Sequence, residues 1–243
     1  MKIHWTIVIL ACASAAAQTL PSYDVYRAPS RIVIDGRLNE RAWRQAPPAG
    51  DFHFNWWKSG QQEQTEVRLL WDDHYLYAAY FCHDKHISAS VTERHGPVSR
   101  DDCVELFVAP NPDRVRNYYG LEINAIGTLL GSRKSDDGKT LVRSVPDGLR
   151  YRTSYQGLPI KRDSPEDDHW ILEMAVPWAS YSADAAHTPP RDGDRWRLNL
   201  NRCGGVTNPQ YSTWSPVHTP APNFHVPESF GWVRFVNRPP PRR

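Results

Sequence analysis

The stretch "DDCVELFVAP", residues 101–110, decides the fold because its side chains alternate between the two faces of one strand. In a strand, every second side chain points to the same face. The face expected in the core carries Val104, Leu106 and Val108, and Glu105 lies on the opposite face. This pattern predicts a sheet that covers a core with one face and offers polar groups on the other.

The same two-residue period recurs along the chain. It occurs in "YYGLEINAIG" (118–127), "HWILEMAVPW" (169–178) and "WRLNLNRC" (196–203), and in a predicted hairpin over residues 65–84. Many short strands with polar turns and little helix predict an all-β fold. We expect an antiparallel β-sandwich (jelly-roll-like) with a few short helices.

Two stretches near the N-terminus predict the first elements of this fold. "RIVIDG" (31–36) alternates Ile32 and Ile34 before an Asp-Gly turn and predicts a first strand. "LNERAWRQAP" (38–47) has helical spacing and ends at proline, which predicts a short helix.

The first residues have the pattern of a secretory signal. Lys2 supplies a charge, residues 5–11 form an apolar run too short to span a bilayer, and residues 15–17 are alanines that suit a cleavage site. Cleavage after Ala17 predicts a secreted or periplasmic protein. Lipidation of Cys12 is the alternative.

No linker or internal repeat divides the rest of the chain. We therefore expect a signal peptide (1–17), one domain (18–236) and a basic, proline-rich tail (237–243). The 29 basic and 27 acidic residues nearly cancel, which argues against a nucleic-acid partner. No stretch after the signal is long and apolar enough to predict membrane insertion, and the sequence leaves the oligomeric state open.

The cysteines leave two alternatives open. Beyond the signal there are Cys82, Cys103 and Cys203, so at most one disulfide and one free thiol can form within a chain. The alternative is three buried thiols that act as small apolar side chains. No C-x-x-C pair occurs, which argues against a zinc ribbon, a thioredoxin site and covalent haem attachment.

Several stretches together resemble the carbohydrate-binding family 9-like modules, which are sandwich domains best known as sugar-binding appendages of xylanases. The resemblance runs from about Arg31 to Phe235. The stretches that carry it, in order, are "IDGRLNERAW", "WDDHYLYAAYFCHD", "RDDCVELFVAPNP", "YYGLEINAIGT", "HWILEMAVPW", "YSTWSP" and "NFHVPESFGWVRF". It implies a non-catalytic protein associated with polysaccharide breakdown.

The resemblance also implies a sugar end clamped between two Trp rings, with carboxylate, Arg and amide groups on its hydroxyls. Glu105 of this clamp is present. Ser99 and Phe224 stand where the family has the two Trp residues, and Glu122 stands where it has Arg. The resemblance therefore supports the family's fold more strongly than it supports the family's sugar clamp. It also raises calcium as a possible bound ion.

A sugar offers C–H patches that stack on aromatic rings and hydroxyls that need hydrogen-bond partners. The polar strand face and the aromatic loop 211–235 together provide both kinds of group. We expect the saccharide to contact Glu105, Glu122, Asn124, Trp214 and Phe224, with Arg100 and Asp101 at the rim. Trp56-Trp57 is a second aromatic candidate.

Three alternatives remain. Glu105 and Glu122 could form the carboxylate pair of a glycoside hydrolase. The domain could instead serve protein interaction, or bind haem with Met174 as an axial ligand, although Met174 fits better in the core. For calcium, the acidic pairs 72–73, 101–102 and 167–168 could supply oxygen ligands, but none has a calcium-specific spacing.

Overall fold

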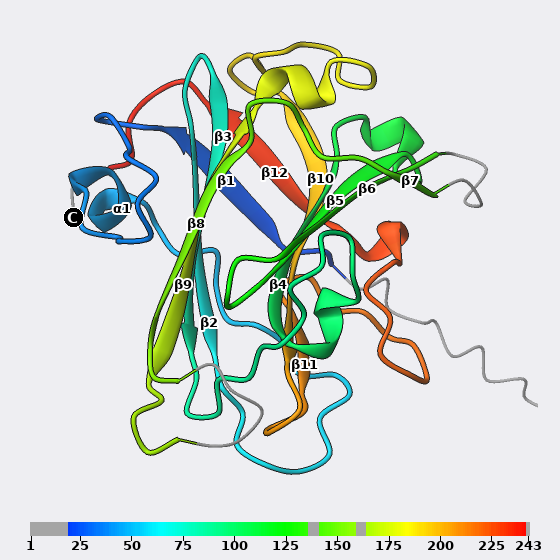
Figure 1. Cartoon of the computed structure of the whole chain (residues 1–243). Coiled ribbons are helices and arrows are strands. Elements are labelled where there is room, and N and C mark those ends of the chain that lie inside the picture. The colour runs from blue at the N-terminus through cyan, green and yellow to red at the C-terminus, as the bar shows by residue number, and fades with distance from the viewer. Residues whose placement is uncertain (1–18, 136–140, 159–163, 242–243) are drawn as a thin grey trace, which may run out of the picture.

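The computed structural model describes residues 19–135, 141–158 and 164–241 (Figure 1). The expected signal peptide lies outside these residues. Among them, helix is confined to α1 (Arg41–Gln45) and to the short 3-10 turns η1 (Val98–Arg100), η2 (Pro112–Arg114), η3 (Trp178–Tyr181) and η4 (Pro227–Ser229). The strands are β1 (Ser22–Arg27), β2 (Thr65–Trp71), β3 (Tyr75–His83), β4 (Asp102–Ala109), β5 (Tyr118–Asn124), β6 (Leu129–Lys134), β7 (Leu141–Arg143), β8 (Arg150–Gln156), β9 (His169–Pro177), β10 (Arg195–Gly204), β11 (Tyr211–Thr213) and β12 (Gly231–Val236). The expected all-β class is confirmed.

The strands form one continuous sheet rather than two separate ones. Their order is β7-β6-β5-β4-β10-β12-β1-β2-β3-β9-β8, and β11 pairs with β10. Neighbours are antiparallel except at β1, which runs parallel to both β12 and β2. In Figure 1 the strands β2, β3, β8 and β9 lie to one side of β4, β5, β6 and β10. The two groups of strands therefore belong to one sheet, which is continuous through β1.

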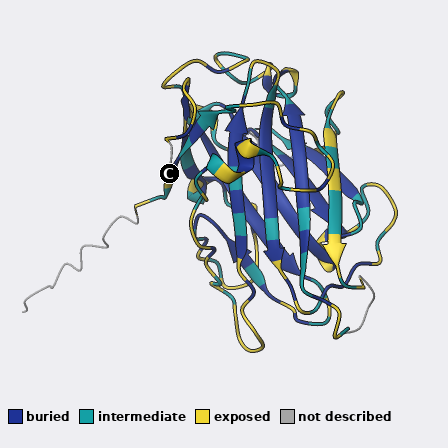
Figure 2. Ribbon diagram, turned by 90° about the vertical axis from the view of Figure 1, so that its left-hand side faces the viewer, coloured by how far each residue is buried: buried dark blue, intermediate teal, exposed yellow. Residues whose placement is uncertain are grey.

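The core lies between these two groups of strands. The stripe of Val104, Leu106 and Val108 faces the same core as Leu172 and Met174 of β9, as predicted. The Tyr80 hydroxyl of β3 donates to the Glu105 carbonyl of β4 at 2.9 Å, which ties the two groups together. Figure 2 shows the strands largely buried and the connecting loops exposed. Met174 is fully buried and packs in this core.

The prediction of a first strand at residues 31–36 is wrong. Ile32 is buried against the α1 side of the sheet, but the segment pairs with no strand. The backbone N–H groups of Asp35 and Gly36 donate to the Glu173 side chain instead, at 2.9 and 3.1 Å. The Glu173 carboxylate accepts hydrogen bonds that a neighbouring strand would otherwise accept. The first strand of the sheet is β1.

A buried arginine links β10 to the end of β3. Arg202 has no exposed surface, and its guanidinium donates to Asp84 Oδ2 at 2.8 Å and to the His83 carbonyl at 2.7 Å. Asp102 and Glu63 lie 3.8 and 3.9 Å from the same guanidinium. Such a buried charge needs this set of partners, because an unpaired ion is costly in the interior. The network fixes the end of β3 and the start of β4 relative to β10.

The three cysteines beyond residue 18 are buried and form no disulfide. Cys103 lies directly opposite Cys203 across β4 and β10, and Cys82 belongs to the main core. Burial raises the pKa of each thiol. Of the two alternatives left by the sequence, the structure agrees with three buried thiols.

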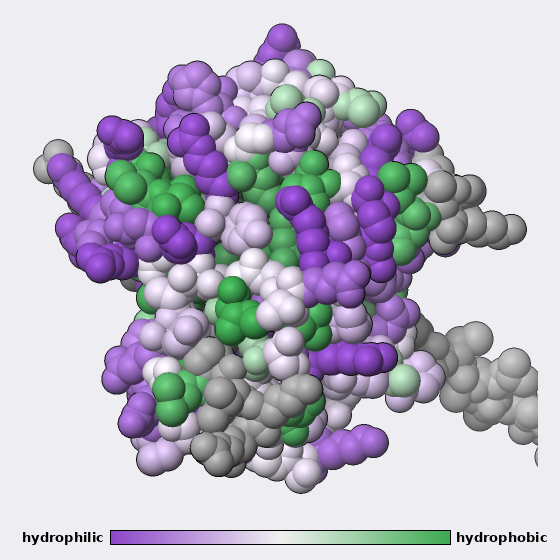
Figure 3. Space-filling view, in the orientation of Figure 1, coloured by the Kyte–Doolittle hydropathy of each residue, from purple (hydrophilic) through white to green (hydrophobic). Residues whose placement is uncertain are grey.

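The surface seen in Figure 3 carries apolar patches separated by polar side chains. Within the described residues, no helix is long and apolar enough to cross a membrane. The start of the C-terminal tail is attached to the sheet, because the Arg27 N–H donates to the Arg238 carbonyl at 3.0 Å.

Candidate functional site

A pocket of about 310 Å³ lies on the polar face of β4, β5 and β10. We call it the carboxylate pocket. The sheet and η1 contribute Ser99, Arg100, Glu105, Glu122 and Cys203. Strand β11 contributes Tyr211, and the loop after it contributes Pro222, Asn223, Phe224 and His225. The alternation of β4 and β5 explains the arrangement, because their apolar side chains fill the core and leave the carboxyl groups on this face.

Glu105 and Glu122 face each other across β4 and β5. Directly opposite residues of an antiparallel pair have Cβ atoms about 4.5–5.5 Å apart. Asn201 Nδ2 donates to Glu105 Oε2 at 3.3 Å, whereas the Glu122 side chain accepts no hydrogen bond from another residue that the structure describes. Glu122 is therefore the carboxyl group left free for a ligand.

The pair titrates far from the usual range of carboxyl groups. Burial, reinforced by the neighbouring Glu122, raises the pKa of Glu105 well above its ordinary value. Burial raises the pKa of Glu122 to about 7, with nearby Arg143 opposing the rise. Two close carboxyl groups in a poorly hydrated site hold a proton near neutral pH. A protonated carboxyl donates a hydrogen bond and an ionised one accepts, so the pair can satisfy both roles of a ligand hydroxyl.

The opposite wall of the pocket is built from fixed rings. Phe224 is 7% exposed and packs against Trp56 and Tyr211, with ring centroids 5.7 and 6.1 Å apart. His225 stacks on Phe107 at 4.9 Å with an interplanar angle of 17°. Burial, helped by two nearby cations, lowers the pKa of His225 to about 4, so the ring is neutral at neutral pH. The wall thus offers an apolar surface without charge.

Not every predicted contact residue reaches the pocket. Arg100, Glu105, Glu122 and Phe224 line it together. Trp214 lies in the core, 2% exposed, with Nε1 donating to the Ala49 carbonyl at 2.8 Å. A ligand has no access to that ring, so its place corrects the expectation that Trp214 binds sugar.

Asp101 and Asn124 also serve the fold. Asp101 accepts hydrogen bonds from the backbone N–H groups of Ser90 and Val91, at 3.0 and 2.8 Å. Asn124 Nδ2 donates to Asp101 at 2.8 Å, and both side chains are buried. The two residues anchor the segment before η1 to β5. They support the pocket from behind, and the pocket lining does not include them.

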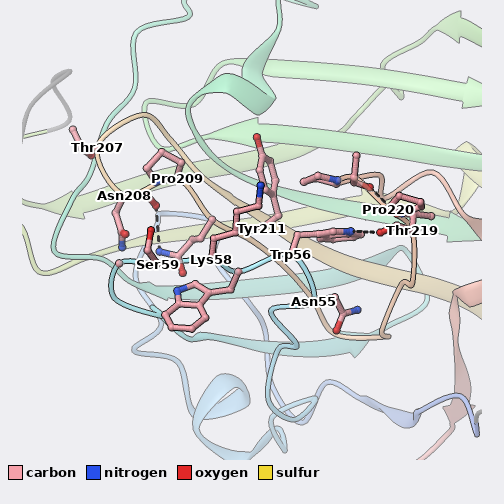
Figure 4. A pocket seen from close by; sticks show the side chains of 15 residues that line it. Asn55, Trp56, Lys58, Ser59, Thr207, Asn208, Pro209, Tyr211, Thr219 and Pro220 are labelled. Carbon is pink, nitrogen blue, oxygen red and sulfur yellow. Dashed lines mark hydrogen bonds between the residues drawn. The ribbon is translucent and has the colours of Figure 1, made fainter.

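Sequence reasoning missed a second hollow, of about 760 Å³, shown in Figure 4. We call it the tryptophan cleft. It is bounded by residues 55–60, 207–211 and 219–222. Trp56 Nε1 donates to the Thr219 carbonyl at 2.8 Å, drawn as a dashed line (Figure 4). The Trp56-Trp57 pair was the one signal for this cleft in the sequence.

The acidic pairs do not offer calcium a set of free oxygens. Asp72 accepts from the N–H groups of His74 and Tyr75, at 2.7 and 2.9 Å, and Asp168 pairs with Lys85. Asp101 is engaged as described above. Among the residues that the structure describes, no three or more His, Cys, Asp or Glu side chains form a group that could hold a metal ion. These residues therefore do not fit the calcium raised by the resemblance.

The chain matches known carbohydrate-binding proteins in sequence and fold. Residues 51–235 match the model of a family described as carbohydrate-binding family 9. A candidate carbohydrate-binding protein from Bacteroides uniformis shares the fold with a TM-score of 0.75 at 22% identity, covering 89% of this chain and 100% of that one. A family 9 carbohydrate-binding module from Caldicellulosiruptor kristjanssonii, solved with cellotriose, has a TM-score of 0.61 at 14% identity, covering 89% and 95%.

Two curated enzymes contain a similar segment. Endo-1,4-beta-xylanase A of Thermoanaerobacterium saccharolyticum and exoglucanase XynX of Acetivibrio thermocellus are each 26% identical over 149 residues, or 61% of this chain. The match covers only 11% and 12% of those proteins. The similarity thus concerns one module of much longer chains.

Proposed function

The chain belongs to carbohydrate-binding family 9, and from this premise we propose that it binds a saccharide in the carboxylate pocket. The family is one of non-catalytic binding modules, which confirms the prediction that the chain is not an enzyme. One observation carries the proposal: the free carboxyl of Glu122 and the ring of Phe224 line the same pocket. A sugar needs both kinds of surface.

Different side chains of the pocket bind different parts of the sugar. The Glu105 and Glu122 carboxyl groups hydrogen-bond ligand hydroxyls, and Arg100 adds a donor at the rim. Phe224 supplies an apolar ring for the C–H face of the sugar. Ser99, Glu122 and Phe224, the three positions where this chain departs from the family's clamp, all line this pocket. With one ring in place of two, binding of a single sugar is expected to be weaker than in a two-ring clamp.

The proposed setting is outside the cytoplasm. The support is the pattern of residues 1–17, which predicts an exported protein, secreted or periplasmic. The similarity to modules of a xylanase and an exoglucanase supports a role beside polysaccharide breakdown. We also propose that the curled sheet is folded as a jelly-roll-like sandwich.

Calorimetric titration with glucose, cellotriose and xylotriose tests the proposal. Replacing Phe224 with Leu keeps an apolar side chain but removes the ring, and is expected to weaken binding by about 1–3 kcal/mol. Phe81→Leu is the matched control, because Phe81 is a half-buried ring on β3 that stacks on His169 away from the pocket.

Three results would count against the proposal. Equal affinities of Phe224→Leu and the unchanged protein would show that the ring does not touch the sugar. Absence of binding to a broad glycan array would leave the protein-interaction alternative. Release of reducing sugar from xylan or cellulose would contradict the assignment of the chain as a non-catalytic module.

A further inference from the structure

The tryptophan cleft adjoins the carboxylate pocket. Tyr211 and Pro222 line both hollows, and Trp56 of the cleft packs on Phe224 of the pocket. The cleft is the larger of the two, about 760 Å³ against about 310 Å³. Ligand sites in proteins range over roughly 300–1,000 Å³. A linear ligand with one unit in the pocket can therefore continue past Tyr211 into the cleft.

The shape of the cleft is held by hydrogen bonds beneath it. Asn208 Nδ2 and Gln210 Nε2 donate to Glu63 Oε2 at 3.1 and 3.3 Å. Glu63 belongs to the buried network of Arg202. On the other side, the bond from Trp56 to the Thr219 carbonyl fixes that ring to the proline-rich loop. A cleft that is already formed loses little freedom when a ligand binds, which favours affinity.

The cleft also presents groups without partners. Trp57 is 42% exposed, and its indole N–H donates to no residue that the structure describes. The Tyr211 hydroxyl has no hydrogen-bond partner in the described part of the chain either. Trp and Tyr, which combine an apolar ring with a polar group, are enriched at binding surfaces. An exposed indole beside free polar groups suits the C–H faces and hydroxyls of a sugar.

The ionisable side chains that line the cleft and the pocket indicate which class of ligand the site binds. Lys58 is the single ionisable side chain among the described residues around the cleft apart from the Tyr211 hydroxyl, and two carboxyl groups line the adjoining pocket. Carboxyl groups repel an anionic ligand when they ionise. Lys58 and Arg100, the two permanent cations of the combined lining, equal its two carboxyl groups in number, and most other groups are amides, hydroxyls and rings, so the site is matched to an uncharged ligand with many hydroxyls.

We propose that the tryptophan cleft is a second sugar subsite, so that the protein binds a neutral oligosaccharide chain that spans the carboxylate pocket and the cleft. This inference rests on the proposed function, because the first sugar occupies the pocket. Trp57 is the stacking ring of the second subsite, and the Tyr211 hydroxyl lies at the passage between the two. Affinity therefore rises with chain length.

Calorimetric titration with cello- and xylo-oligosaccharides of one to six units tests the inference. In the unchanged protein the hexasaccharide of one series is expected to bind at least tenfold more tightly than its monosaccharide. Trp57→Ala is expected to lower that ratio by roughly tenfold, the usual effect of removing one exposed stacking ring. Tyr155→Ala is the matched control, because Tyr155 is 48% exposed on β8 and lines neither hollow.

The outcomes separate this inference from the proposed function. If the unchanged protein binds one to six units equally, or if Trp57→Ala and Tyr155→Ala keep the same ratio, the second subsite is refuted while binding in the pocket stands. If the unchanged protein binds no member of either series or of a broad glycan array, both fail. Loss of the long-chain preference in Tyr211→Phe as well would support the passage between the two hollows.

Discussion

Replacing Glu122 with Gln is predicted to remove a pH-dependent loss of stability that the carboxylate pocket imposes. Burial raises the pKa of Glu122 from 4.5 to about 7. The folded protein therefore holds this proton more tightly than the unfolded chain does. Between about pH 4.5 and pH 7 the unfolded chain ionises first, so the free energy of unfolding falls as the pH rises through that window.

The size of the loss follows from the pKa values. Each pKa unit is worth about 1.4 kcal/mol, so the rise of the Glu122 pKa corresponds to about 3 kcal/mol lost in full above pH 7. Glu122→Gln keeps the shape of the side chain without the charge and should be spared this loss. It also removes a neighbour that raises the pKa of Glu105, which flattens the pH dependence further.

The assay is guanidinium unfolding followed by tryptophan fluorescence at about pH 5 and about pH 8. The unchanged protein is expected to lose about 2.5 kcal/mol more than Glu122→Gln between the two conditions, because part of the loss has already occurred at pH 5. Glu93→Gln, at an exposed position, serves as the control and should follow the unchanged protein. Parallel pH dependences for Glu122→Gln and the unchanged protein would refute the buried carboxyl pair.

Further predictions concern the core, the buried arginine, the thiols and the histidine of the pocket wall. Trp214→Ala should lower the free energy of unfolding by about 3–5 kcal/mol in a denaturant titration, because it empties a core site; a change below about 1 kcal/mol would mean that the ring is not core. Arg202→Met should cost about 3–5 kcal/mol in the same titration by leaving buried carboxylates unpaired, and a neutral effect would contradict the network. Thiol titration of the signal-less protein should find no reactive cysteine when folded and three after unfolding without reductant, whereas one would reveal a disulfide. Titration of His225 by NMR should show a neutral ring down to about pH 5, and a midpoint near 6.5 would show a hydrated wall.

The strand faces could be predicted from the sequence because a two-residue period leaves a direct trace. The alternation in 101–110 and 118–127 placed Glu105 and Glu122 on one polar face, and the structure has them opposite each other. Their raised pKa values depend on burial by the loop of Phe224 and His225, which no periodicity reveals.

Other features could not be predicted, because the sequence does not show which polar groups take up one another's hydrogen bonds. Asp101 and Asn124 read as rim or contact residues, but backbone N–H groups occupy Asp101. Residues 31–36 alternate like a strand, yet Glu173 from a distant strand takes their N–H groups. In the late loop, the spacing of Trp214 and Phe224 gives no sign that Trp214 enters the main core while Phe224 joins a second buried cluster and also lines the pocket.

The position of β1 has a consequence for how the chain folds. β1 pairs with β12, so Ser22 lies beside Trp232 and Asp24 pairs with Arg234. The contact between Asp24 and Arg234 joins residues 210 positions apart, and such distant pairings slow folding because a long loop must close first. The edge of β1 that pairs with β12 therefore stays without a partner until β12 has been made. The sheet therefore closes late, because β1 and β12 can pair only after the strands between them have been made.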